Sequence, residues 1–112
     1  MAFVIAVAQQ KGGAGKSTLA ANLAVALGED APVALLDTDP QQSLARWHAI
    51  RVAQGHAPLR FETPSGWRVG TALDGFRRSE GFVVLDTPPQ VDADAARALR
   101  AADLVLVPLQ PS

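Results

Sequence analysis

Short apolar segments separated by longer mixed segments dominate the chain. Uninterrupted apolar runs cover residues 3–8, 33–36, 82–85 and 104–107. Runs without polar alternation are typical of strands that are covered on both faces of a parallel sheet. We therefore predict four strands of this buried type, and a weaker strand, 59–62, at one edge of the sheet.

Helical segments lie between these runs. Leucines at positions 19, 23 and 27 follow i, i+4 spacing and predict a helix over residues 16–27, ended by Gly28. Further helices are predicted over 41–53, 67–77 and 92–101, the last with Asp92 as its N-cap. Strands that alternate with helices indicate an α/β fold with right-handed crossovers, here in a single domain over residues 1–112.

The amino-acid composition excludes several kinds of functional site. The chain has no cysteine, which excludes disulfides, iron–sulfur clusters and thiolate catalysis. His48 and His56 lack partners at metal-ligand spacing and are expected to be solvated. A net charge of -1 indicates no strong overall attraction to nucleic acid. No apolar run reaches the roughly 20 residues of a membrane span, and the N-terminus lacks the basic segment of a signal peptide, so we expect a soluble cytoplasmic protein without membrane association.

A glycine-rich loop, Gln-Lys-Gly-Gly-Ala-Gly-Lys-Ser-Thr, follows the first predicted strand and opens the first helix. Its glycines let successive backbone N–H groups point at phosphate oxygens, and the helix N-terminus adds positive potential. Lys16 would reach the β- and γ-phosphates, Ser17 would ligate Mg²⁺, and Thr18 would touch the α-phosphate. A tight strand-to-helix turn is the alternative interpretation. The loop backbone that would cradle the phosphates comprises Gly12, Gly13, Ala14 and Gly15.

The loop departs from the ordinary phosphate-loop pattern, since Gln10 stands where a glycine is usual and Lys11 follows it. Lys-Gly-Gly-x-Gly-Lys-Ser resembles the deviant Walker A signature of the ParA/MinD superfamily of ATPases. That resemblance implies a three-layer P-loop NTPase fold with a mainly parallel sheet of about five strands here, and ATP and Mg²⁺ as ligands. It further implies a catalytic role for Lys11, which would reach the phosphates bound by the partner in an ATP-dependent homodimer. A solvated loop lysine is the alternative.

Two aspartates end the second apolar run, in Asp37-Thr-Asp39-Pro-Gln. Carboxyl ends of strands are where open α/β sheets bind ligands. The motif resembles the switch I segment of the ParA family, which implies that Asp39 orients the attacking water and that Asp37 supports the Mg²⁺ shell. An Asp-Pro pair can also be simply a turn that begins a helix.

The third run ends in Asp86 and is followed by Thr87-Pro-Pro. This is the form of a Walker B strand. Because Mg²⁺ keeps several waters and takes few protein ligands, Asp86 would hold the ion through water, opposite Ser17. Thr87-Pro-Pro resembles a switch II segment, where loss of the γ-phosphate would be sensed.

The C-terminal run resembles the family's strand that leads into a proline segment beside the adenine. Pro108 and Pro111 are the candidate base contacts, although prolines that merely close an edge strand are the alternative. Trp47 makes the chain similar to small ParF-like plasmid partition ATPases, but core packing is the favoured explanation for both Trp47 and Trp67. The resemblance covers about the first half of a typical member, so the fold is expected to be truncated at its C-terminus.

The resemblance implies an ATPase of plasmid or chromosome partition, with a centromere-binding adaptor protein as partner. Nonspecific DNA is a further implied partner, although the C-terminal basic surface that the family uses for it is not among these 112 residues. An ATP-dependent small-molecule synthase, such as a cobyrinate-amidating or dethiobiotin-forming enzyme, is one alternative. A truncated, non-catalytic nucleotide-binding module is the other. The nitrogenase-reductase branch is excluded because it needs cysteine ligands.

Overall fold

The structure is a computed structural model that describes residues 1–8 and 14–108. The predictions for Lys11, Gly12, Gly13 and Pro111 lie outside the described residues. Strands and helices alternate along the described chain: β1 (Phe3–Val7), α1 (Ala14–Gly28), β2 (Val33–Asp37), α2 (Ser43–Ala53), β3 (Arg60–Glu62), α3 (Arg68–Arg77), β4 (Phe82–Asp86), α4 (Ala93–Ala101) and β5 (Leu104–Leu106). Each predicted element is present, with bounds that differ by no more than two residues.

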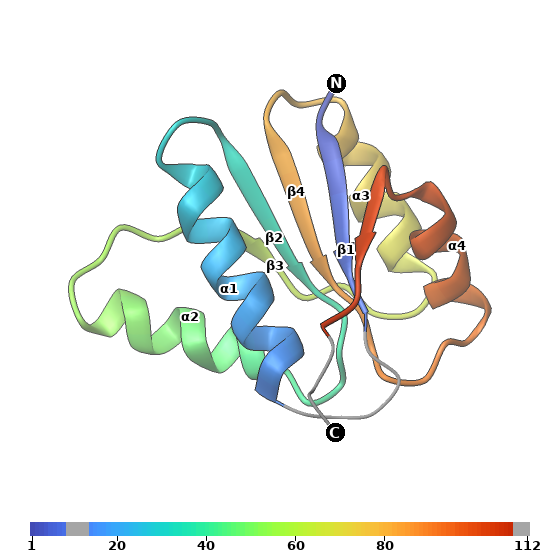
Figure 1. Ribbon diagram of the computed structural model, residues 1–112, viewed down its shortest axis with the longest axis horizontal. Helices are drawn as coiled ribbons and strands as arrows, with labels where there is room; N and C mark the ends of the chain where they lie inside the picture. The colour runs from blue at the N-terminus through green and yellow to red at the C-terminus, as the bar shows by residue number, and fades with distance from the viewer. Residues whose placement is uncertain (9–13, 109–112) are drawn as a thin grey trace.

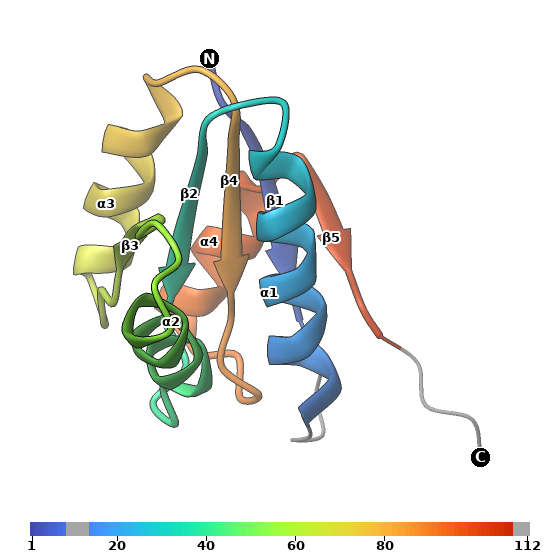
Figure 2. The same cartoon turned by 90° about the vertical axis from the view of Figure 1, so that its left-hand side faces the viewer.

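The strands form a parallel sheet in the order β3-β2-β4-β1-β5. The prediction that 59–62 forms an edge strand is confirmed. In the centre of the sheet, Asp86 is level with Val7 of β1 and with Asp37 of β2. Because the strands run in one direction, their carboxyl ends meet at a single edge, and the first turn of α1 lies at that edge too (Figure 2).

Helices cover both faces of the sheet and give the predicted three-layer α/β fold. Figure 1 shows α1 and α2 on one side of the sheet and α3 and α4 on the other. Along each strand, alternate side chains point into two separate hydrophobic cores, one on each face of the sheet. The core under α1 and α2 contains Val7, Leu35 and Val84 with alanines of α1. The core under α3 and α4 contains the strand residues Val4, Ala6, Ala34, Leu36, Val83 and Leu85.

This alternation decides where the strand-end acids point. Asp37 comes two residues after Leu35, and Asp86 comes two residues after Val84. Both acids therefore share the α1/α2 face of the sheet, because side chains two residues apart on a strand point the same way. The strand periodicity thus directs these carboxylates toward the side of the sheet from which α1 approaches.

The structure corrects the predicted starts of two helices and confirms the predicted cap of a third. Helix α1 begins at Ala14, two residues earlier than predicted, which places Lys16 and Ser17 within its first turn. Helix α2 begins only at Ser43, because the residue before it, Gln42, has a left-handed backbone with φ of 54°. Asp92 caps α4 as predicted, with its side chain accepting a hydrogen bond from Ala95 N at 2.8 Å.

Two side-chain predictions fail. Trp67 is 71% exposed and is not a core residue, whereas Trp47 packs against the core under α1 and α2 as predicted. His48 is not simply solvated, since its Nε2 accepts a hydrogen bond from Leu59 N at 3.1 Å and its ring stacks on Phe61.

The C-terminal run is not covered on both faces within the described residues. Leu104, Val105 and Val107 are all more than two-fifths exposed, at 44%, 42% and 54%. The reason is position, since β5 is an edge strand that pairs with β1 on one side. Within residues 1–8 and 14–108, no helix combines the length and the apolar character needed to cross a membrane.

One glycine is required by a close approach of backbones. Gly81 has a φ of 95°, and an added Cβ there would collide with the carbonyl oxygen of Pro32. The same oxygen accepts a hydrogen bond from Phe82 N at 2.9 Å. The turn before β4 therefore fixes how β4 enters the sheet beside β2.

Candidate functional site

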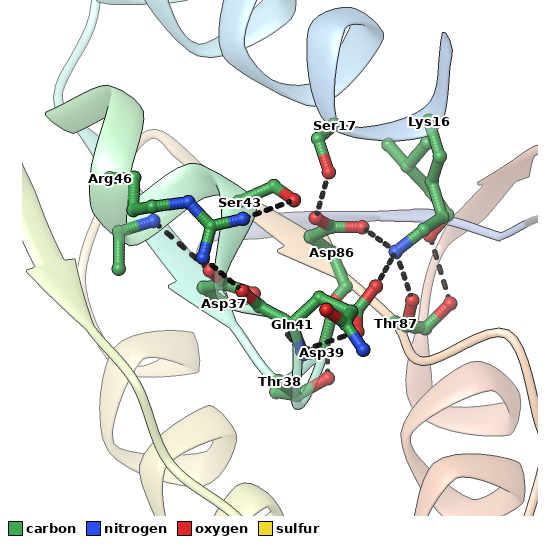
Figure 3. A network of polar contacts seen from close by, with 12 residues as sticks. Lys16, Ser17, Asp37, Thr38, Asp39, Gln41, Ser43, Arg46, Asp86 and Thr87 are labelled. Atoms are coloured by element: carbon green, nitrogen blue, oxygen red, sulfur yellow. Dashed lines mark hydrogen bonds and ion pairs between the residues drawn. The ribbon is translucent and has the colours of Figure 1, made fainter. Parts of the chain in front are cut away.

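The ammonium group of Lys16 is the centre of a buried polar cluster. Lys16 lies in the first turn of α1 and is only 2% exposed. Its Nζ donates to Asp39 Oδ2 at 2.8 Å, to Asp86 Oδ1 at 2.5 Å and to the carbonyl oxygen of Thr87 at 2.5 Å (Figure 3). An ammonium has three N–H donors, so each of them has an acceptor in this arrangement.

Asp86 connects β4 to α1 through both of its carboxylate oxygens. While Oδ1 accepts from Lys16, Oδ2 accepts from Ser17 Oγ at 3.0 Å. Asp86 is fully buried, and this burial raises the pKa of its carboxyl group even though Lys16 and Ser17 act to lower it. The negative charge of Asp37 adds to the increase. An ionised Asp86 therefore depends on a nearby positive charge.

Asp39 lies in the loop between β2 and α2, and the pKa of its carboxyl group is lowered, whereas that of Asp86 is raised. Burial alone would raise its pKa, but the hydrogen bond from Lys16, the Gln41 N–H and the charge of Lys16 together lower it. The Gln41 N–H donates to Asp39 Oδ1 at 3.0 Å. Asp39 is thus held ionised. Its Oδ2 accepts a hydrogen bond from Lys16, and its Oδ1 accepts one from the backbone of its own loop.

The Asp37 carboxylate accepts hydrogen bonds from backbone N–H groups. Its Oδ1 accepts from Asp39 N and its Oδ2 accepts from Ala45 N, both at 3.1 Å. Burial raises the pKa of Asp37, and these two backbone hydrogen bonds oppose the increase. The direct contacts of Asp37 shape the loop that carries Asp39 and the first turn of α2. A role for Asp37 in the Mg²⁺ shell is supported by no contact here and stays a prediction.

The two loops beyond β2 and β4 are hydrogen-bonded to the sheet through threonines. Thr38 donates from N and from Oγ1 to the carbonyl oxygen of Asp86, at 3.0 and 2.8 Å. Thr87 donates in the same way to the carbonyl oxygen of Val7, at 3.1 and 2.9 Å. Sequence reasoning missed the role of Thr38. The available signal was a hydroxyl residue directly after the last acid of a buried strand, at both Thr38 and Thr87.

Two hollows flank the cluster. One, of about 380 Å³, lies between the loops after β2 and β4 and the helices α3 and α4, and is lined by both loops and by Val69, Ala95 and Ala98. The other, of about 230 Å³, lies between α1 and α2 and is lined by Ser17, Thr18 and Trp47, among others. The Lys16 cluster is therefore bordered by open space on both faces of the sheet edge.

The remaining predicted residues that the structure describes lie at the same edge or just beyond it. Gly15 and Thr18 are exposed in the first turn of α1, and Ala14 begins that helix. Pro108 follows β5, whose carboxyl end meets the same edge because β5 runs parallel to β1. The structure thus assembles Lys16, Ser17, Asp39 and Asp86 directly, and it brings Thr18 and Pro108 to the neighbourhood without a contact to Lys16.

The oxygen atoms at this edge have the chemistry that Mg²⁺ prefers. Ser17 Oγ and the Asp86 carboxylate are hard oxygen donors that already converge. Among residues 1–8 and 14–108 there is no cluster of three or more His, Cys, Asp or Glu side chains that could hold a metal ion alone. A Mg²⁺ ion held here would therefore take its other ligands from water and from phosphate oxygens, as Mg²⁺ commonly does.

Comparison with known proteins places the chain in a family. Residues 5–108 match the CobQ/CobB/MinD/ParA nucleotide binding domain. The chain is 42% identical to the "Maintenance of carboxysome distribution protein A" of Gloeobacter kilaueensis, over 97% of this chain and 50% of that protein. It is 35% identical to the "Chromosome-partitioning ATPase Soj" of Thermus thermophilus, over 95% of this chain and 54% of that protein. The chain spans about half the length of the curated relatives it matches.

Solved structures share the fold. A plasmid partition protein of Borrelia burgdorferi superposes with a TM-score of 0.81 at 22% identity, covering 100% of this chain and 67% of that one. A plasmid partition protein of Borrelia burgdorferi B31 bound to AMPPNP gives a TM-score of 0.75 at 23% identity, covering 96% and 62%. At these identities the likeness concerns the fold, which is that of ParA-like P-loop NTPases. With the match over residues 5–108, the chain belongs to the CobQ/CobB/MinD/ParA family of nucleotide-binding domains.

Proposed function

We propose that this chain is the nucleotide-binding part of a ParA-like ATPase that binds Mg-ATP and hydrolyses it. The observation that carries the proposal is the convergence of Lys16 and Ser17, from the first turn of α1, on Asp86 at the end of β4. A cation, a hydroxyl and a carboxylate at a helix N-terminus suit a phosphate with its metal ion. The family match and the AMPPNP-bound structure of like fold support the same ligand.

Each residue then has a distinct part. Lys16 would bind the β- and γ-phosphates, with the loop backbone from Gly12 to Gly15 and Thr18 completing the phosphate cradle. Ser17 and Asp86 would hold Mg²⁺, which supplies neutralisation of the phosphate charge when it is bound. Asp39, kept ionised by its neighbours, would orient the attacking water. Catalysis of this kind consists of positioning and electrostatic stabilisation.

We infer that hydrolysis takes place in an ATP-dependent homodimer. The basis is the sequence Lys-Gly-Gly-x-Gly-Lys-Ser, whose first lysine, Lys11, matches the lysine that reaches across the dimer in deviant Walker A ATPases. The prolines Pro108 and Pro111 are proposed to contact the adenine. Asp37 is proposed to support the metal site indirectly, through the loop that carries Asp39.

The cellular role that we propose is partition of a plasmid or chromosome, with a centromere-binding adaptor and nonspecific DNA as partners of the whole protein. The likeness to a chromosome-partitioning ATPase supports this role. Distribution of carboxysomes is the second candidate, because two relatives bear that name and one of them is 42% identical. A synthase of the same family and a non-catalytic nucleotide-binding module are the alternatives from other classes.

Solution mass tests the proposal directly. Light scattering on Asp39→Ala, in which hydrolysis is slowed, should give a dimer with Mg-ATP and a monomer with Mg-ADP. A monomer under both conditions, although the nucleotide binds, would reject the dimer mechanism for these 112 residues. Absence of any Mg-ATP affinity would reject both the ATPase and the synthase interpretations for this chain.

A further inference from the structure

The hydrogen bonds of the buried Lys16 affect which nucleotide ligand the site can bind. In the structure, Lys16 Nζ is engaged by Asp39 Oδ2, Asp86 Oδ1 and the carbonyl oxygen of Thr87, at 2.5–2.8 Å. All three acceptors belong to the sheet edge. Phosphate binding by Lys16, as the proposed function requires, would have to take the ammonium away from some or all of these partners.

Removing the ammonium would leave two carboxylates without their cation. Asp86 is 0% exposed and Asp39 is 7% exposed, so water cannot replace the lysine easily. An uncompensated buried charge is strongly unfavourable, and an arriving phosphate would add negative charge at the same place. A nucleotide without a metal ion therefore competes with the two carboxylates for one lysine.

A divalent cation removes this competition. Asp86 and Ser17 supply oxygen ligands for it, and its two positive charges compensate the carboxylates that Lys16 leaves. Lys16 can then turn to the phosphates at no loss of compensation for Asp86. Only the metal-bound nucleotide brings this second cation with it.

We propose that Lys16 is an internal counter-ion for Asp39 and Asp86 in the nucleotide-free chain, and that this arrangement makes the site select metal-bound over metal-free nucleotide. The inference rests on the proposed function, because it concerns the same phosphate-binding site. It goes further in assigning Asp39 a second effect: Asp39 suppresses binding of nucleotide that arrives without a metal ion.

The test compares affinities for ADP, which avoids hydrolysis, in excess Mg²⁺ and in EDTA by isothermal titration calorimetry. Asp39→Asn releases one ion pair of Lys16 without removing a proposed metal ligand. It should bind metal-free ADP about tenfold or more tightly than the unmodified chain, as expected for one charge-assisted hydrogen bond. Its affinity for Mg-ADP should change much less.

Asp94→Asn is the matched control. Asp94 borders the neighbouring cavity and pairs with Arg97 at 3.8 Å, but it makes no contact with Lys16. Its substitution removes the same charge and should leave metal-free affinity within about twofold. Equal metal-free affinities for Asp39→Asn and Asp94→Asn would overturn the inference. So would an unmodified chain that binds ADP equally well with Mg²⁺ and with EDTA.

A second measurement needs no nucleotide and separates this inference from the proposed function. If Lys16 occupies the carboxylates, Lys16→Gln should bind Mn²⁺ alone more tightly than the unmodified chain, by about tenfold, in an electron paramagnetic resonance titration. Circular dichroism would verify that the variant is folded. Equal Mn²⁺ binding would overturn the counter-ion role even in a chain that binds ADP. Tighter Mn²⁺ binding without any ADP affinity would support that role while rejecting the ATPase proposal.

Discussion

Asp37 and Asp86 lie side by side at the ends of β2 and β4, yet their carboxylates have different partners. Asp86 contacts the side chains of Lys16 and Ser17, whereas Asp37 accepts hydrogen bonds from the backbone N–H groups of Asp39 and Ala45. The same strand position thus carries a candidate metal ligand on one strand and a loop-stabilising residue on the next.

Replacing Asp37 with Ala should destabilise the fold. The change leaves the N–H groups of Asp39 and Ala45 without their acceptor in a buried place, which should lower the free energy of unfolding by about 1–3 kcal/mol. Asp37→Asn keeps one amide oxygen as acceptor, so its free energy of unfolding should fall less than that of the Ala variant. Urea denaturation followed by circular dichroism measures both. Equal stability of the Ala variant and the unmodified chain would contradict the assigned role.

Asp39→Asn should change the stability of the chain in a pH-dependent way. The folded state lowers the pKa of Asp39 below its ordinary value of 3.8. Its contribution is therefore fully present above pH 3.8 and is lost as the pH falls through the lowered pKa of the folded state. The unmodified chain should be more stable than the variant at neutral pH, and the difference should shrink below pH 3.8. Unfolding titrations in EDTA at a series of pH values would show it.

Asp86→Asn should show the opposite dependence. Burial raises the pKa of Asp86 above 3.8 in the folded state. The unmodified chain therefore loses stability relative to the variant as the pH rises from 3.8 through the raised pKa. In the same metal-free titrations, the stability of the variant relative to the unmodified chain should therefore increase as the pH rises toward neutral. A difference that is constant with pH would mean that the folded state does not shift this carboxyl group.

The two lysines of the glycine-rich loop should separate binding from hydrolysis. Lys16→Ala should weaken binding of a fluorescent ATP analogue and lower phosphate release by about 100-fold or more. Lys11→Ala should keep nucleotide binding, because we propose that Lys11 acts only on the nucleotide of the partner subunit, but it should lose hydrolysis to a similar degree. Hydrolysis at the normal rate in Lys11→Ala would exclude the cross-dimer role.

Gly81→Ala and Gly55→Ala form a pair that isolates one backbone contact. The two glycines have nearly the same φ, 95° and 93°, but only at Gly81 would a Cβ meet a neighbour, the carbonyl of Pro32. Gly55→Ala should cost about 1–2 kcal/mol for backbone strain alone. Gly81→Ala should cost about 3 kcal/mol or more, because the clash adds to the strain. Equal losses in thermal denaturation would mean that β2 and β4 can move apart.

The sequence was sufficient for the fold and for most of the candidate site. Apolar runs located the strands, and two-residue periodicity, counted back from Asp37 and Asp86, would also have placed both acids on the face of α1. What the pattern could not reveal is which atoms each carboxylate contacts. That depends on Gln42, whose left-handed backbone delays α2 to Ser43 and brings Ala45 N within reach of Asp37.

The other failures also have local causes. Trp67 was predicted to pack in the core as a residue of an amphipathic helix, but it is the N-cap residue of α3 and is exposed. His48 was predicted to be solvated because it has no metal-ligand partner, yet Leu59, just before β3, supplies a backbone donor and Phe61 of β3 supplies a ring that stacks on it. Contacts between an element and its distant neighbour in sequence are not encoded in spacing alone.

The threonine hydrogen bonds extend the sheet by one residue beyond each strand. The amide hydrogens of Thr38 and Thr87 are bonded as strand amides are, to Asp86 and Val7. In the first loop, strand-like hydrogen bonding therefore ends at residue 38, so that Asp86 lies within the hydrogen-bonded sheet and Asp39 lies beyond it. Under the proposed function, Asp86 would therefore hold its metal ion from the hydrogen-bonded sheet, whereas Asp39 would act from a loop that is free of strand hydrogen bonds.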